Sequence, residues 1–177
     1  MSKAARQPAG PPLILAFPDQ QPRRAAPPVL LILACSGQKS PAPELLPAWE
    51  RYTGGAYRVL RGALAAAGGQ IPGLTLGILS ARYGLIPGNQ PIPTYEQRLT
   101  PAQVEVLTPT VVATVERWLA ATPYRRIYLH LGARYRLPLA PSAALATAHQ
   151  AGIVTISAGG IGQQLQQIKT WLRAGTP

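Results

Sequence analysis

The sequence predicts an α/β fold, in which a three-layer domain is built on a mostly parallel sheet of about four or more strands with helices on both faces. Two observations support this prediction. Short, continuously apolar runs alternate along the chain with longer segments of helical periodicity, and each run ends in glycine or small polar residues. Continuous apolar runs are typical of strands that are covered on both faces, as parallel strands are.

Four apolar runs are the predicted strands. They are 29–34 (VLLILA), 74–79 (LTLGIL), 126–131 (RIYLHL) and 153–156 (IVTI). The carboxyl ends of parallel strands meet at one edge of the sheet, and ligands of such sheets bind beyond that edge. We therefore expect four segments that contain glycine or polar residues to converge there, namely 35–39, 80–82, 132–134 and 157–160.

Helices are predicted between these strands. Segment 55–67 places Tyr57, Leu60 and Leu64 on one stripe. Residues 100–103 (TPAQ) have the form of a capping box. We expect the helix that starts there to be interrupted at Pro109, to restart, and to end near residue 121. Two further helices are predicted at 142–150 and 162–172.

Residues 1–28 differ in composition from the rest of the chain. They contain seven of the 20 prolines and an excess of positive charge. We therefore predict a flexible, Pro-rich basic arm, followed by a single α/β domain at 29–177. No apolar run approaches the ~20 residues that span a bilayer, so no membrane partner is expected and a cytoplasmic location is the default.

The charge balance favours an anionic partner. The net charge is +11, and arginine supplies 14 of the 17 basic residues. Because arginine pairs with phosphate through two parallel hydrogen bonds, this excess favours a nucleotide or a nucleic acid. The codon preference of a GC-rich genome is the alternative explanation. The sequence indicates neither a cofactor nor an oligomeric state.

The thiol and imidazole side chains do not predict a metal site. The one cysteine, Cys35, allows no intrachain disulfide, and neither His130 nor His149 has a partner at metal-ligand spacing. Cys35 is either a nucleophile activated by a neighbour such as Lys39 or a small buried hydrophobe. His130 alternates with apolar residues of its strand, which favours a packed, hydrogen-bonded histidine over a catalytic one.

Segment 78–85 (ILSARYGL) is the strongest functional candidate. We expect it to be a functional loop that leaves a buried strand, not a plain turn, and to begin a long connection over 80–99. Ser80 and Glu96 are catalytic candidates, and Glu96 either moves a proton or is the ion partner of an arginine. The expected ligand-binding residues of this connection, with Tyr95 stacking on the ligand, are Arg82, Tyr83, Gly84, Tyr95 and Arg98.

Three other segments offer groups that bind anions. Ser36 and Lys39 follow the first strand, where Lys39 is a third catalytic candidate and would neutralise a phosphate or carboxylate. The spaced glycines of a P-loop are missing there. Thr53 precedes the first long helix and is either its N-cap or an anion ligand. The last helix opens on residues whose free N–H groups attract anions, namely Gly160, Gly162 and Gln163.

Taken in chain order, these motifs form a recognisable series. They are CS-x-x-K (35–39), YTG (52–54), ILSARYGL (78–85), YE-x-RL (95–99), LGARYR (131–136) and GIGQQL (160–165). Over roughly residues 29–172, the series resembles small bacterial and phage domains of unknown function related to the YaaA-type peroxide-stress proteins. YaaA-type proteins are associated with DNA binding and protection from iron-driven oxidative damage, and the resemblance implies a shared pocket without supplying a reaction. A fainter likeness over residues 79–95 to archaeosine synthase implies chemistry on a nucleobase.

Two functions are therefore expected as alternatives. The first is an enzyme acting on a nucleobase, a nucleotide or a nucleic acid, in which Lys39 and Arg82 hold an anion and Glu96 moves a proton. The second is a non-catalytic DNA- or RNA-binding protein of stress-response or mobile-element origin, whose arginines contact phosphates.

Overall fold

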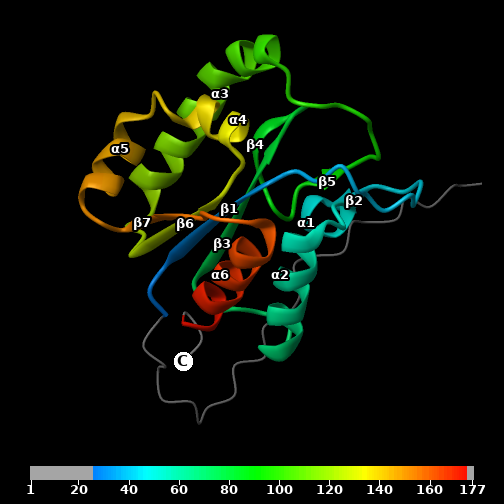
Figure 1. The fold of residues 1–177 in the computed structure, drawn as a ribbon, viewed down its shortest axis with the longest axis horizontal. Helices are drawn as coiled ribbons and strands as arrows, with labels where there is room; N and C mark the ends of the chain where they lie inside the picture. The colour runs from blue at the N-terminus through cyan, green and yellow to red at the C-terminus, as the bar shows by residue number, and fades with distance from the viewer. Residues whose placement is uncertain (1–25, 175–177) are drawn as a thin grey trace, which may run out of the picture.

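The computed structural model describes residues 26–174, and its centre is a five-stranded sheet in the order β4-β3-β1-β6-β7 (Figure 1). Four strands are parallel, and β4 pairs antiparallel with β3 at one edge. The strand bounds are β1 Val29–Ala34, β3 Leu74–Ser80, β4 Gly84–Pro87, β6 Arg126–His130 and β7 Val154–Ile156. All four predicted strands are present, and the predicted α/β class with a mostly parallel sheet is confirmed.

The helices follow the predicted order, with short elements added between them. A two-stranded antiparallel ribbon joins β2 (Leu46–Pro47) to β5 (Pro91–Ile92). The helices are α1 Ala48–Arg51, α2 Gly55–Ala66, α3 Pro101–Ala121, α4 Ala133–Arg136, α5 Ala143–Gln150 and α6 Ile161–Arg173, with a 3-10 turn at Leu137–Leu139. No helix within residues 26–174 is long and apolar enough to cross a membrane. Most of the predicted arm at 1–28 lies outside the described residues.

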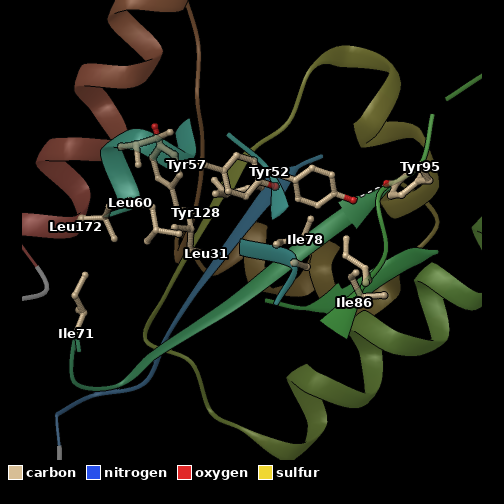
Figure 2. Close-up of a cluster of buried hydrophobic side chains, with 14 residues drawn as sticks. Leu31, Tyr52, Tyr57, Leu60, Ile71, Ile78, Ile86, Tyr95, Tyr128 and Leu172 are labelled. Carbon is tan, nitrogen blue, oxygen red and sulfur yellow. Dashed lines mark hydrogen bonds between the residues drawn. The ribbon is translucent and has the colours of Figure 1, made fainter. Parts of the chain in front are cut away.

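The buried side chains form two clusters, and alternate residues of β1 belong to different ones. Leu31 and Leu33 share the first cluster with residues of α2 and α6, as the close-up in Figure 2 shows for Leu31, Leu60 and Leu172. Leu30 and Ile32 share the second cluster with residues of α3 and α5. Because successive side chains of a strand point to opposite faces, the continuous apolar run of β1 contributes to both clusters.

The long connection expected over residues 80–99 is interrupted by two short strands, β4 and β5. Residues 81–83 form a short turn that joins β3 to β4, and Ser80 pairs with Gly84 across this hairpin. Gly84 has a φ of 70°, which suits glycine, and a Cβ there would lie 3.3 Å from Val111. The apolar residues 85–86 extend the sheet, so segment 78–85 is a strand–turn–strand unit and the expectation of a loop distinct from a turn was wrong.

The expected interruption of the helix at Pro109 is also absent, because α3 continues through it. The capping box is present: Thr100 Oγ1 accepts from the backbone N–H of Gln103 at 3.3 Å, and Gln103 Oε1 accepts from that of Thr100 at 2.8 Å. Proline removes the hydrogen bond to the carbonyl four residues earlier. That residue, Glu105, is exposed, so the helix tolerates the loss.

Candidate functional site

The carboxyl ends of β1, β3, β6 and β7 lie along one edge of the sheet because the four strands are parallel. The chain runs from β1 to β3 on one side of β1, and then crosses to β6 and β7 on the other side. The strand order therefore reverses between β1 and β6, and ligands of open α/β sheets bind in the crevice at such a reversal. The segments after β1 and β6, which begin at Cys35 and Leu131, lie on either side of this reversal.

The segment after β1 is fastened to the start of α2. Ser36 Oγ accepts from the backbone N–H of Gln38 at 3.0 Å, and the carbonyl of Gln38 accepts from the N–H of Thr53 at 2.9 Å. A Cβ on Gly54 would lie 2.4 Å from Ser36 Oγ, so this approach requires glycine. Gly54, not Thr53, is the N-cap of α2, because the backbone of Thr53 is held by the preceding loop.

A chain of hydroxyl groups connects β3 to the segment before α2. Ser80 Oγ lies 2.7 Å from the Tyr95 hydroxyl, which lies 2.5 Å from the Tyr52 hydroxyl, and the two phenol groups point at each other in Figure 2. Ser80 Oγ also accepts from the backbone N–H groups of Arg82 and Tyr83. Because Ser80 is fully buried, it shapes the turn after β3 and does not reach a ligand.

Two cationic side chains lie against the ring of Tyr95. Lys39 Nζ is 4.9 Å from its centroid, and the guanidinium carbon of Arg82 is 5.7 Å from the same centroid. The Tyr83 ring also packs edge-on against it. Tyr95 is only 6% exposed, so its ring positions the two cations. The sequence led us to expect that this ring stacks on a ligand, and its burial leaves no face for a base.

The carboxylate nearest to these cations is weakly held. Glu96 Oε1 lies 3.5 Å from Lys39 Nζ, and the Glu96 side chain is 87% exposed, whereas that of Lys39 is 6% exposed. An ion pair with one solvated partner contributes little. Among the described residues, the two cations on the Tyr95 ring are therefore balanced only by the solvated carboxylate that pairs with Lys39, which leaves this part of the edge electropositive.

The carboxyl ends of β1 and β6 bring Cys35 next to a residue that the sequence reasoning gave no role, Tyr135. Cys35 Sγ lies 3.1 Å from the Tyr135 hydroxyl, and the Tyr57 hydroxyl donates to the Ala34 carbonyl at 2.9 Å. Tyr135 belongs to the motif at residues 131–136, but the sequence does not indicate which residue it contacts. A half-buried thiol and a phenol thus face each other at the strand reversal.

The remaining predicted residues are not joined to this group by hydrogen bonds. Arg98 is exposed. At the start of α6, Gln163 Oε1 accepts from the N–H of Gly160 at 2.9 Å, and Gly162 is exposed beside them. Ser157 connects this turn to the sheet, because its hydroxyl lies 3.1 Å from Nδ1 of His130, whose pKa is lowered by burial. His130 is therefore packed and hydrogen-bonded.

Burial of the phenol groups predicts instability in alkaline solution. It raises the pKa of Tyr95 to about 12 and also raises the pKa values of Tyr52 and Tyr57. Above pH ~10 the unfolded chain releases tyrosine protons that the folded protein retains. The free energy of unfolding should therefore be unaffected by these groups below pH ~10 and fall as the pH rises from there.

Urea denaturation between pH 8 and 11 measures this effect. Tyr57→Phe removes one of the groups that lose a proton on unfolding. Above pH ~10, the free energy of unfolding of this variant should therefore fall less steeply with pH than that of the wild type, by up to ~1.4 kcal/mol per pH unit. Ile78→Val, a destabilised control in the same cluster, should keep the wild-type slope. Equal slopes for Tyr57→Phe and wild type would contradict the assignment.

Sequence comparison places these residues in a described family. A family of unknown function (DUF6884) matches residues 29–170. The chain belongs to this family. The match covers the whole described sheet and the segments that follow β1 and β6. A comparison with curated proteins gave no significant match.

Among solved structures, the chain is similar to one described as "Crystal structure of AF0587, a protein of unknown function". The sequence identity is 14% and the TM-score is 0.47. The alignment covers 81% of this chain and 44% of that one, so this chain spans less than half of that protein's length.

Proposed function

We propose that this protein is an enzyme that binds a phosphate-bearing nucleotide at the carboxyl edge of the sheet, and that it acts on the bound nucleobase or nucleotide. The observation that carries the proposal is the pair of cations, Lys39 and Arg82, on the Tyr95 ring. Lys39 Nζ lies 4.9 Å and the guanidinium carbon of Arg82 lies 5.7 Å from the centroid of this one ring, and the largely solvated Glu96 compensates their charge only weakly. An anionic ligand supplies the missing charge.

Each neighbouring group has a role in this proposal. Lys39 and Arg82 bind the phosphate, and the half-buried ring of Tyr83 is left as the aromatic face for a base. Glu96 is exposed beside the two cations and moves a proton on the ligand. The half-buried thiol of Cys35, next to Tyr135, faces the crevice where the rest of the ligand lies.

Calorimetric titration with nucleotides tests this proposal. Nucleoside monophosphates, the matching nucleosides and inorganic phosphate are added separately to the full chain at low salt. We expect the monophosphates to bind most tightly, since only they offer both the anion and the base. Equal affinity for nucleosides and monophosphates would show that the cations are not used, and no binding of any monophosphate would overturn the proposal.

A second candidate function is the non-catalytic binding of DNA or RNA. It is supported by four exposed arginines in segments that follow β3 and β6 or precede α3, namely Arg82, Arg98, Arg134 and Arg136. Affinity for a duplex should then fall steeply with salt, because each neutralised phosphate releases counter-ions. Duplex binding that persists without turnover of any nucleotide would favour this candidate over the enzyme.

We further propose that the sheet is the middle of three layers and that the YaaA-type resemblance reflects a shared carboxyl-edge pocket. The two clusters that divide the residues of β1 support the layered arrangement. The motifs at 35–39, 78–85 and 131–136 support the shared pocket, since they all follow strands whose carboxyl ends meet at one edge.

A further inference from the structure

One edge of the sheet is formed by β7, the outermost strand next to β6 (Figure 1). The N–H of Ser157 donates to the carbonyl of Leu129 in β6 at 3.0 Å, and the carbonyl of Ile153 accepts from β6 at 2.8 Å. The odd-numbered residues of this segment therefore direct their backbone groups toward β6. Because this direction alternates along a strand, Val154 and Ile156 direct their N–H and C=O groups away from the sheet.

The outer side of β7 is open to a further strand. No strand within residues 26–174 pairs with it, and an unpaired edge is a template for pairing with another chain. Natural proteins commonly protect such an edge with lysine, proline or an inward-pointing charge. Residues 151–160 contain none of these residue types, whereas the strand at the opposite edge, β4, ends in Pro87.

The segment that contains β7 also differs from the rest of the chain in charge. Residues 137–168 include no aspartate, glutamate, lysine or arginine, although the chain has 17 basic and 6 acidic residues. The central part of a protein interface is depleted in charged residues. Two copies of this chain, each with a formal net charge of +11, repel each other at long range. An uncharged edge adds least to that repulsion at contact.

We propose that β7 pairs antiparallel with β7 of a second copy, in a symmetric dimer whose sheet is continuous across both chains. With the two-fold axis at Thr155, Val154 lies opposite Ile156 of the partner subunit. The outward N–H and C=O groups of this pair exchange both hydrogen bonds, and the symmetric pair does the same. Thr155 then faces its own counterpart, with Cβ atoms about 4.5–5.5 Å apart.

A second copy is favoured over an unrelated strand because the edge is complementary to itself. The three residues of β7 are valine, threonine and isoleucine, and β-branched side chains pair well across antiparallel strands. The two sheets run in opposite directions in this dimer, so their carboxyl edges point away from each other. The interface is therefore separate from the residues around Tyr95, and either proposal can fail without the other.

Sedimentation equilibrium of the full chain, between about 1 and 100 µM, tests the proposal. An ionic strength of about 0.15 M screens the repulsion between the two net charges. We expect a dimer, alone or in equilibrium with the monomer. A chain that stays monomeric over the whole range would overturn the proposal, whether or not the strand of another protein pairs with β7.

Substitutions of the exposed Thr155 locate the interface. Thr155→Lys places two like charges opposite each other across the paired strands, so the dissociation constant of the dimer should rise at least about tenfold. Thr155→Val keeps a β-branched side chain and should preserve the dimer. Thr110→Lys adds the same charge at an exposed position of α3 and should also preserve it. Unchanged dimerisation of Thr155→Lys would overturn the proposal.

Disulfide cross-linking tests the register of the pairing. In a Cys35→Ser background, Thr155→Cys brings two thiols together across the two-fold axis, at a separation that a disulfide can bridge. Mild oxidation should therefore give a covalent dimer on a denaturing gel. Thr110→Cys in the same background is the matched control and should remain a single chain. If the dimeric Thr155→Cys protein did not cross-link, the interface would lie elsewhere and the proposal would be wrong.

Discussion

Replacing the buried Arg51 by methionine is expected to destabilise the protein more than replacing any other charged residue within residues 26–174. Its guanidinium is fully buried and donates to four carbonyls, those of Ser40, Ala42, Glu44 and Ile92, at 2.5 to 3.3 Å. Methionine keeps the apolar stem and removes every donor. A buried carbonyl that loses its donor costs about 1–3 kcal/mol. Because the bond to Ile92 is buried and the other three are partly buried, we expect a loss on the order of 4 kcal/mol.

Urea denaturation monitored by circular dichroism measures this loss. The matched control is Arg61→Met, since Arg61 is half-buried and donates to two carbonyls, those of Trp49 and Tyr52, at 3.2 and 3.1 Å. Arg61→Met should cost about 1–2 kcal/mol. If Arg51→Met were as stable as this control, the four bonds would not hold the segment before α1 as the structure indicates.

Arg51 also shows why part of the fold was not predictable from sequence. Nothing near it in the sequence indicates that a charged side chain will be buried, because its buried hydrogen bond, to the carbonyl of Ile92, spans 41 residues. The Nε atom of Arg51 is buried without a partner, which is rare for a guanidinium. A helical arginine is ordinarily exposed, so the sequence alone favours the wrong environment.

The strands were predictable because their signal is local. Each apolar run is bounded by glycine, proline or a small polar residue, and β1 and β3 fall within a residue of their expected limits. The capping box of Thr100 is likewise a four-residue pattern. The hairpin at Ser80–Gly84 was missed because β4 is a short apolar segment whose pairing with β3 depends on the tertiary fold.

The candidate site was predictable in its residues but not in their roles. Lys39, Arg82, Tyr95 and Glu96 do come together, as the convergence of strand ends implies. The burial of Tyr95 was not foreseeable, since it depends on the hydroxyl of Tyr52, 43 residues away in sequence. The contact between Cys35 and Tyr135 joins residues 100 positions apart, so only the strand order could reveal it.

Replacing Lys39 by methionine is expected to abolish most anion binding while leaving the fold intact. The Lys39 side chain is 6% exposed and its ammonium lies against Tyr95, with the solvated Glu96 as its ion partner. Methionine preserves the apolar contacts of the stem. Because exchanging a buried charge for an apolar group is often neutral or stabilising, the free energy of unfolding should change by less than about 1 kcal/mol.

Although Lys39→Met should leave the free energy of unfolding almost unchanged, it should strongly reduce nucleotide affinity. Removing a buried charge that binds an anion costs about 2–5 kcal/mol, so the dissociation constant should rise on the order of 100-fold. Glu96→Gln is the matched variant, because it deletes the competing carboxylate and keeps the cation. It should bind the nucleotide at least as tightly as the wild type, and it should lose turnover if Glu96 moves the proton.

The two variants together separate the proposed roles. Tight binding without turnover in Glu96→Gln, with weak binding in Lys39→Met, assigns Lys39 to the ligand and Glu96 to the reaction. If Lys39→Met kept the nucleotide affinity of the wild type, the anion would bind away from the Tyr95 ring, and Lys39 and Arg82 would not form its site. Unfolding of Lys39→Met would instead show that its ammonium is needed for the packing between the segment after β1 and Tyr95.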